Sequence, residues 1–175
     1  MALIRRRASA PRREPRSSDF EVVEHDEWRF VDDHEPLPEA GDLWVSLSRH
    51  RSDERVRAHA GRVGVRIPND TPADTLASLS REVAAIAIEL PTQRDGCAYT
   101  LARWLRGRHG FAGELRAVGK VVRDQLPYLA RVGFDAFELA RGSAQSALAS
   151  FDDLGVHYQA SSDQPLPLWK RAARA

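Results

Sequence analysis

The chain has little cysteine, little lysine and no long apolar stretch, and each shortage excludes a class of protein. Its single cysteine, Cys97, can form no internal disulfide, which is typical of proteins in a reducing compartment. No apolar run approaches the roughly 18 residues of a membrane-spanning helix. The N-terminus carries charge without an apolar core, unlike a secretory signal. These features predict a cytoplasmic protein with no membrane segment.

Basic residues are almost all arginine, and their distribution along the chain is uneven. Only Lys120 and Lys170 are lysines among 26 basic residues, and the net charge is +1, so the composition does not indicate a nucleic-acid-binding protein. Six arginines nevertheless fall between Arg5 and Arg16 among serine, alanine and proline. We interpret residues 1–19 as a disordered Arg-rich tail, residues 20–170 as a single α/β domain and residues 171–175 as a second disordered tail.

Short strand-like segments alternate with helical patterns from residue 43 onward. The strand-like segments are residues 43–47, 62–67, 84–90, 114–118, 134–139 and 155–159. This alternation predicts a parallel sheet with right-handed crossovers. Before it, residues 20–33 hold two β-prone runs on either side of residues 25–27, which predict a hairpin.

The predicted strands have two unlike faces. One face is apolar and includes Val65, Ile86 and Ile88, whereas the other is small or charged and includes Gly64 and Ala87. An open sheet with helices on both sides would be apolar on both faces. We therefore predict a mostly parallel, TIM-barrel-like sheet, partial or complete, with the small and charged face inside. The alternative is an open doubly wound parallel sheet.

A charged or titratable residue lies one or two positions before the end of most of these strands. These residues are Arg66, Glu89, Arg116, Glu138 and His157. They should gather at the C-terminal ends of the strands, where α/β folds bind ligands.

Two interpretations of this layer remain open. With Arg94 and Lys120 from the following loops, Arg116 would form an anion-binding site, and Asp95 and Asp124 would lie on its rim. Alternatively the charges form an internal ion-pair layer, because buried charges must be paired.

Other motifs do not add a reaction. Gly119-Lys120 lacks the spacing of a phosphate-binding loop, and no G-x-G-x-x-G opens a helix. The histidines show no metal-ligand spacing, so neither a metal nor a nucleotide cofactor is predicted. Arg49 and His50 are expected at an exposed helix start.

Residues 88–139 contain D-G-x-x-Y, G-E-L-R-A-x-G and R-D-Q-L, and in this segment the chain resembles DUF934, a bacterial family of unknown function. The resemblance extends from about Trp28 to Trp169. The matching positions are Asp95, Gly96, Tyr99, Gly113, Glu114, Arg116, Gly119, Arg123, Asp124, Gln125, Gly133, Phe134 and Asp135. Three positions depart from the family pattern: Cys97, Lys120 and Val132 stand where Arg, Asp and Cys are usual.

Genes of this family commonly lie beside assimilatory sulfite reductase, and some members are labelled oxidoreductases of sulfite reduction. The resemblance therefore implies an accessory or enzyme-like role in sulfur assimilation, with pathway proteins or a small anion as partners. The alternative is a non-catalytic interaction module. An enzyme needs an open cavity lined by Arg94, Arg116 and Lys120, whereas a module has a filled interior and an exposed apolar patch.

Overall fold

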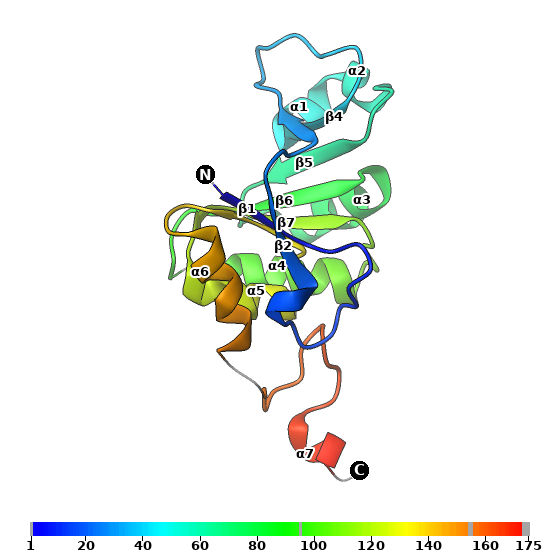
Figure 1. The fold of residues 1–175 in the computed structure, drawn as a ribbon. Helices are drawn as coiled ribbons and strands as arrows, with labels where there is room; N and C mark the ends of the chain where they lie inside the picture. The colour runs from blue at the N-terminus through cyan, green and yellow to red at the C-terminus, as the bar shows by residue number, and fades with distance from the viewer. Residues whose placement is uncertain (1, 95, 154–155, 173–175) are drawn as a thin grey trace.

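The computed structural model describes residues 2–94, 96–153 and 156–172, which fold around one sheet (Figure 1). Its strand order is β2-β1-β8-β7-β6-β5-β4-β3. The strands are β1 (Ala2–Arg6), β2 (Phe20–Val23), β3 (Trp28–Phe30), β4 (Asp42–Ser46), β5 (Val63–Ile67), β6 (Ala85–Leu90), β7 (Glu114–Val121) and β8 (Ala136–Leu139). Strands β3 to β8 are parallel, and β1 runs antiparallel between β8 and β2. The predicted alternating βα units and mostly parallel sheet are confirmed.

Helices cover one face of the sheet. They are α1 (Leu47–Ser52), α2 (Glu54–Arg57), α3 (Ala73–Glu82), α4 (Cys97–Gly107), α5 (Leu126–Val132) and α6 (Ala144–Ala149), with short 3-10 turns η1 (Ser17–Asp19), η2 (Arg123–Gln125) and η3 (Ser150–Asp152). The last helix, α7 (Leu168–Ala172), lies away from the sheet (Figure 1). Helix α4 shows the pattern behind this packing, because Ala98, Leu101, Ala102 and Leu105 lie on one buried stripe. The main core lies between these helices and the apolar face of the strands.

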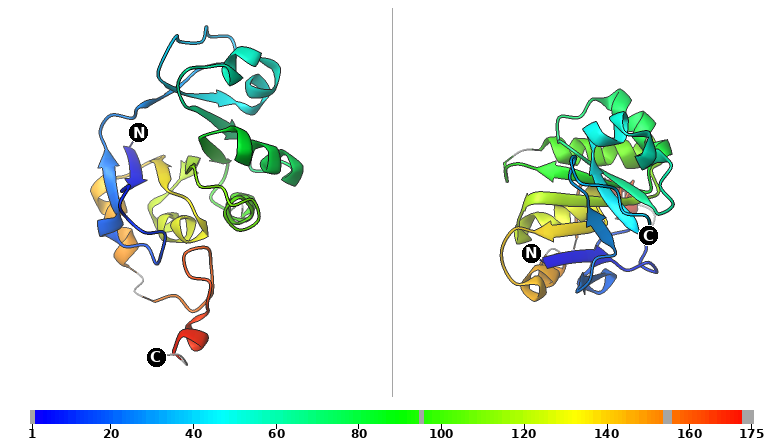
Figure 2. Two further views of the ribbon diagram at one scale, coloured as in Figure 1. Left: turned by 90° about the vertical axis from the view of Figure 1, so that its right-hand side faces the viewer. Right: turned by 90° about the horizontal axis from the view of Figure 1, so that it is seen from above.

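The sheet curls into a half-barrel, with the helices outside (Figure 2). Strands β2 and β3 form its two edges, yet only residues 24–27 connect them. A chain of that length reaches about 18 Å when extended, whereas eight strands side by side in a flat sheet span about 34 Å. The short connection therefore requires the two edges to approach one another.

The predicted hairpin at residues 20–33 is wrong. Strand β2 pairs with β1 and β3 pairs with β4, so the two runs lie on opposite edges and their connection crosses the open side of the half-barrel. A hairpin was expected because nothing local indicates that the partner of β2 lies near the N-terminus.

The N-terminal segment also differs from the prediction of a disordered tail over residues 1–19. Residues 2–6 form β1, in which Ile4 is fully buried against the helix-covered core. The arginines of this segment bond to carboxylates of the domain, as Arg12 does to Asp135 with Nε 2.9 Å from Oδ1. The described domain therefore begins at residue 2. At the other end, residues 171 and 172 belong to α7, and residues 173–175 lie outside the described residues.

The prediction of a last strand over residues 155–159 is also wrong for the described residues 156–159. Residue 155 lies outside the described residues, and residues 156–159 form no strand. The sheet position beside β8 that this strand would take is occupied by β1. The N-terminal strand β1 therefore takes the position that was predicted for residues 155–159.

Two tryptophans fill the concave face that the small residues leave open. Trp28 and Trp44 lie with their ring centroids 4.9 Å apart over Ala85, Ala87 and Val118. A Cβ atom on Gly64 would lie 2.5 Å from the Trp44 ring, so the small residue makes room for the indole. The predicted small inner face is thus packed with side chains.

Candidate functional site

Arg116 lies at the centre of an ion cluster on the concave face. It is 1% exposed, and its Nε donates to Glu114 Oε1 at 2.9 Å. Its Nη2 donates to Asp26 Oδ1 at 3.2 Å and its Nη1 to Glu138 Oε1 at 3.2 Å. Its guanidinium also lies 4.9 Å from the centroid of the Trp44 ring. Three carboxylates and an aromatic ring therefore surround this one cation.

Arg5 joins the cluster from β1. Its Nη2 lies 2.7 Å from Asp26 Oδ1 and its Nε lies 3.0 Å from Glu114 Oε2. Burial by itself raises the pKa of Asp26, but the hydrogen bonds from Arg116 and Arg5 outweigh it and hold that pKa below its ordinary value. Burial likewise favours a lower pKa for Arg116, yet Asp26 and Glu114 raise it. The cluster thus pairs two guanidinium groups with three carboxylates.

Arg116 differs in burial from the other two residues of the predicted anion site. Arg116 is buried in the first half of β7, whereas Arg94 and Lys120 are exposed. A bulge at Gly119, which has a φ of +95°, separates Lys120 from the regular part of the strand. A Cβ atom at this glycine would lie 2.7 Å from the Leu90 carbonyl oxygen, so the close approach requires glycine.

Two of the predicted rim residues form a separate ion pair. Arg66 Nη2 lies 2.9 Å from Glu89 Oε1, and the two side chains are 37% and 43% exposed. The guanidinium of Arg66 lies 5.9 Å from the centroid of the Phe30 ring on the edge strand β3. Glu138, in contrast, belongs to the Arg116 cluster. The alternating charges therefore divide into an outer pair and an inner cluster.

The remaining predicted rim residues lie elsewhere or cannot be placed. Asp124 is exposed in η2 and pairs with Arg123 at 3.3 Å. His157 lies outside the sheet, with its ring centroid 6.5 Å from that of Tyr128. Burial lowers the pKa of His157, and the nearby Arg131 lowers it further. Asp95 lies outside the described residues.

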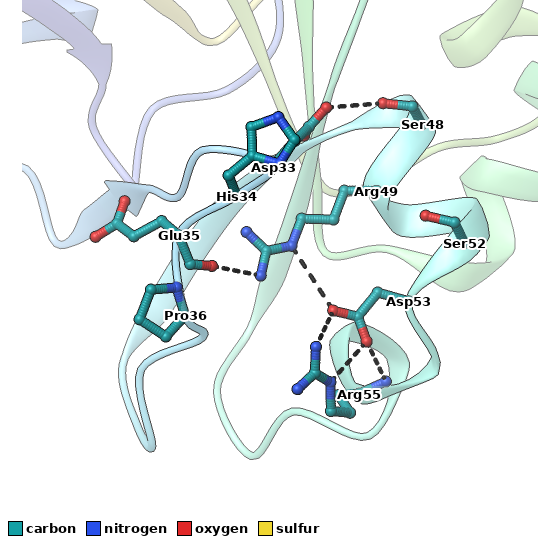
Figure 3. Close-up of a pocket in the computed structure, with 9 residues that line it drawn as sticks. All are labelled: Asp33, His34, Glu35, Pro36, Ser48, Arg49, Ser52, Asp53 and Arg55. Carbon is teal, nitrogen blue, oxygen red and sulfur yellow. Dashed lines mark hydrogen bonds and ion pairs between the residues drawn. The ribbon is translucent and has the colours of Figure 1, made fainter.

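A hollow of about 690 Å³ lies at the C-terminal ends of β3 and β4 (Figure 3). It is lined by Asp33, His34, Glu35, Pro36, Ser48, Arg49, Ser52, Asp53 and Arg55. Arg49 donates from Nη2 to the Glu35 carbonyl oxygen at 2.7 Å and from Nη1 to that of Asp32, and so ties the 31–41 loop to α1. The acidic run at residues 32–35 is the sequence signal that could have indicated this contact.

The expectation that Arg49 and His50 lie at an exposed helix start is wrong, because they are 6% and 4% exposed. The charged groups of the hollow are also already engaged: Arg55 Nε donates to Asp53 at 2.9 Å, and Ser46 donates to Asp33 at 2.6 Å. The bond from Ser46 is the largest cause of the lowered pKa of Asp33, so this carboxyl is ionised at neutral pH.

Over residues 2–94, 96–153 and 156–172, no group of three or more His, Cys, Asp or Glu side chains is placed to hold a metal ion. Within those same ranges, no helix is long and apolar enough to cross a membrane.

Comparison with protein-family models decides the affiliation of the chain. The model of a bacterial protein of unknown function, DUF934, matches residues 64–169. The chain belongs to the DUF934 family. Comparisons with curated proteins and with solved structures gave no significant match.

Several DUF934 core positions have architectural roles in this chain. Gly119 forms the β7 bulge, and Gly133, with a φ of +117°, ends α5 in the left-handed conformation. Arg116 is the centre of the inner ion cluster, and Asp135 holds arginines at the start of β8. The G-E-L-R-A-x-G segment thus specifies how β7 is shaped and how its charges are neutralised.

Proposed function

We propose that this DUF934 protein is a non-catalytic partner in assimilatory sulfite reduction and docks onto sulfite reductase itself. The place in sulfur metabolism comes from the family resemblance. The docking role is supported by one observation, a surface of exposed large apolar side chains on α5 and on residues 156–172. We call this surface the aromatic platform and define it as Tyr128, Val156, Tyr158 and Trp169.

The aromatic platform contains most of the large apolar groups that face solvent. Its four side chains are 48%, 64%, 59% and 56% exposed, and they are four of the six large exposed hydrophobic side chains in the described part of the chain. The backbone of Leu168 donates to the Tyr158 carbonyl oxygen at 2.9 Å, which brings two parts of the platform together. The C-terminal residues 156–172, which include α7, project from the body of the molecule (Figure 1). Exposed apolar patches of this kind mark interaction sites.

Buried polar contacts hold this segment in one conformation. Arg131 of α5 is 8% exposed, and its Nε lies 3.1 Å from Asp163 Oδ2. Its Nη2 donates to the Gln159 carbonyl oxygen at 2.7 Å. Arg171 donates to the His157 carbonyl oxygen at 2.9 Å and pairs with Glu14 at 2.7 Å. Because the scaffold is fixed, aromatic side chains on it lose little conformational entropy on binding.

The filled interior supports a module over an enzyme. The cation that would have received an anion, Arg116, already has three carboxylate partners, and two indoles pack on the concave face over Ala85, Ala87 and Val118. An interaction surface rich in tyrosine and tryptophan also matches the composition of binding hot spots.

The test uses purified assimilatory sulfite reductase from the same bacterium as the probe and measures its affinity for this protein by biolayer interferometry. Trp169→Ser should weaken binding at least about tenfold, the loss typical of a hot-spot residue. Phe30→Ser is the matched control, because Phe30 is a 46% exposed aromatic outside the platform and its loss should leave affinity unchanged. The absence of binding, or equal loss in both variants, would contradict the proposal.

A further inference from the structure

A second, arginine-lined pocket lies at the end of the sheet opposite the C-terminal ends of the parallel strands. Its volume is about 390 Å³, within the range of small-ligand sites. It is lined by Arg5, Arg6, Arg7, Ala8, Ala10, Arg12, Glu114 and Asp135. Four arginines thus face two carboxylates, an excess of positive groups within the lining itself, while outside the lining Arg5 pairs with Asp26 and Arg7 with Glu21.

Asp135 is saturated with donors and cannot balance this surplus. Arg12 donates to it from Nε and Nη2, each at 2.9 Å. Arg106 donates to the same carboxylate, and the backbone of Leu115 donates to its Oδ2 at 3.2 Å. Asp135 therefore already accepts hydrogen bonds from two arginines, Arg12 and Arg106, without counting Arg6.

Arg6 retains a donor that the protein does not satisfy. Its side chain is 5% exposed, its Nε lies 3.9 Å from Asp135 Oδ1, and this nitrogen has no hydrogen-bond acceptor. Its Nη1 donates to the Pro11 carbonyl oxygen at 2.9 Å, and its guanidinium lies 4.5 Å from the centroid of the Phe20 ring. A buried charged donor without an acceptor is costly, and negative charge in the pocket that Arg6 lines would offset that cost.

Burial is the main cause of the lowered pKa values of two arginines at this pocket, Arg106 and Arg6. Burial lowers the pKa of Arg106 to about 10, and Asp135 raises it only partly while Arg12 and Arg6 lower it further. The pKa of Arg6 is also lowered, chiefly by burial. An anion in the pocket would stabilise both charged forms.

We propose that this pocket binds a small oxyanion such as sulfate, sulfite or phosphate, either free or as the terminal group of a larger molecule. Planar guanidinium groups present paired N–H donors that match two oxygens of such an ion. Arg6 and Arg7 supply donors from β1 and the residue after it, and Arg12 and Asp135 form the opposite wall. This site is independent of the aromatic platform and of docking.

Isothermal titration calorimetry of the full chain tests the proposal with sodium sulfate, sulfite, phosphate and phenyl phosphate at constant ionic strength. Saturable binding of at least one oxyanion is expected, with no response to sodium chloride. A preference for phenyl phosphate over inorganic phosphate identifies a group on a larger molecule, and the reverse preference identifies the free ion. No saturable binding, or an equal response to chloride, overturns the proposal.

Substitutions that remove one positive charge locate the site. Arg6→Gln should weaken oxyanion binding at least tenfold, whereas Arg13→Gln, which removes the same charge from an exposed arginine outside the pocket lining, should weaken it less than twofold. Should Arg6→Gln fail to fold, Arg7→Gln replaces it, because that side chain is 52% exposed and should bind several-fold more weakly. Equal losses at Arg13 overturn the proposal. Trp169→Ser should bind oxyanions normally, which separates failure of this site from failure of docking.

Discussion

Arg116 and Arg66 lie on the same concave face and differ in their surroundings. Arg116 is almost fully buried among Asp26, Glu114 and Glu138, whereas Arg66 forms one half-exposed pair with Glu89. A buried carboxylate that loses its cation keeps its desolvation cost without compensation. An exposed pair contributes little, because water replaces the lost partner. The same substitution at the two positions should therefore have very different effects.

Arg116→Met should lower the free energy of unfolding by about 3–5 kcal/mol, because Glu138 loses its partner and Asp26 and Glu114 share Arg5 alone. Arg66→Met, the matched control, should change it by no more than about 1 kcal/mol. Urea unfolding followed by circular dichroism at pH 7 measures both. Similar losses in the two variants would refute the distinction between the inner cluster and the outer pair.

Among the elements, β1 changes the interpretation of the chain most. Its sequence, Ala-Leu-Ile-Arg-Arg, is short and is followed by an arginine- and proline-rich segment, so composition predicted disorder. In the sheet, both of its edges are paired, and Ile4 lies opposite Phe137 of β8 in the core. Such a strand is part of the domain, and its core residue should matter as much as one in a central strand.

Ile4→Ala should lower the free energy of unfolding by about 2–5 kcal/mol, because it leaves a cavity at a fully buried position. Val22→Ala on the neighbouring strand β2 serves as the control, since Val22 is 38% exposed and should lose about 0.5 kcal/mol or less. Thermal and urea unfolding provide the comparison. If Ile4→Ala proved as mild as the control, β1 would have to be detached from the folded domain in solution.

At the scale of the whole molecule, the connection between the two edge strands links both halves of the half-barrel. Asp26 in this connection lies within bonding distance of Arg5 from β1 and Arg116 from β7, while the next strand, β3, begins at Trp28 and pairs with β4. The carboxylate of Asp26 thus links β1, which lies near one edge of the sheet, to β7 near its centre. The curvature required by the short connection is reinforced by this ion pair.

This contact predicts a defined pH dependence. The pKa of Asp26 is lowered from 3.8, so its stabilisation is fully present above about pH 3.8 and is lost as the pH falls through the lowered folded-state pKa. The difference in unfolding free energy between wild type and Asp26→Asn should therefore be constant from pH 7 to 5 and shrink below about pH 3.8.

Urea unfolding at a series of pH values measures this difference, with Glu27→Gln as the control. Glu27 lies in the same connection and is 72% exposed in its pair with Arg62, so its substitution should have little effect at any pH. A difference for Asp26→Asn that persists undiminished at pH 3 would exclude the ionised carboxylate as the source of the stabilisation.

The local sequence by itself determined the fold class, the inward-facing residues and the family of this protein. Alternation within a strand and spacing within a helix depend on residues close together in the chain, so the residue pattern alone predicted one apolar and one small or charged face for β5 to β8. The sharing of one face by Glu114 and Arg116 followed from the same alternation, and the structure joins them at 2.9 Å.

Only the tertiary structure decided which charged side chains and which strands pair with one another. Asp26 and Arg116 are 90 residues apart, and Arg12 and Asp135 are 123 apart, so no local pattern connects them. The same holds for β1, which takes the edge of β8 predicted for residues 155–159, and for β2 and β3, which lie on opposite edges. Strand pairing and ion pairing over such separations depend on which surfaces the folded chain brings together, and this is why the sequence predicted Glu114, Arg116 and Glu138 on one face but not the contributions of Asp26 and Arg5.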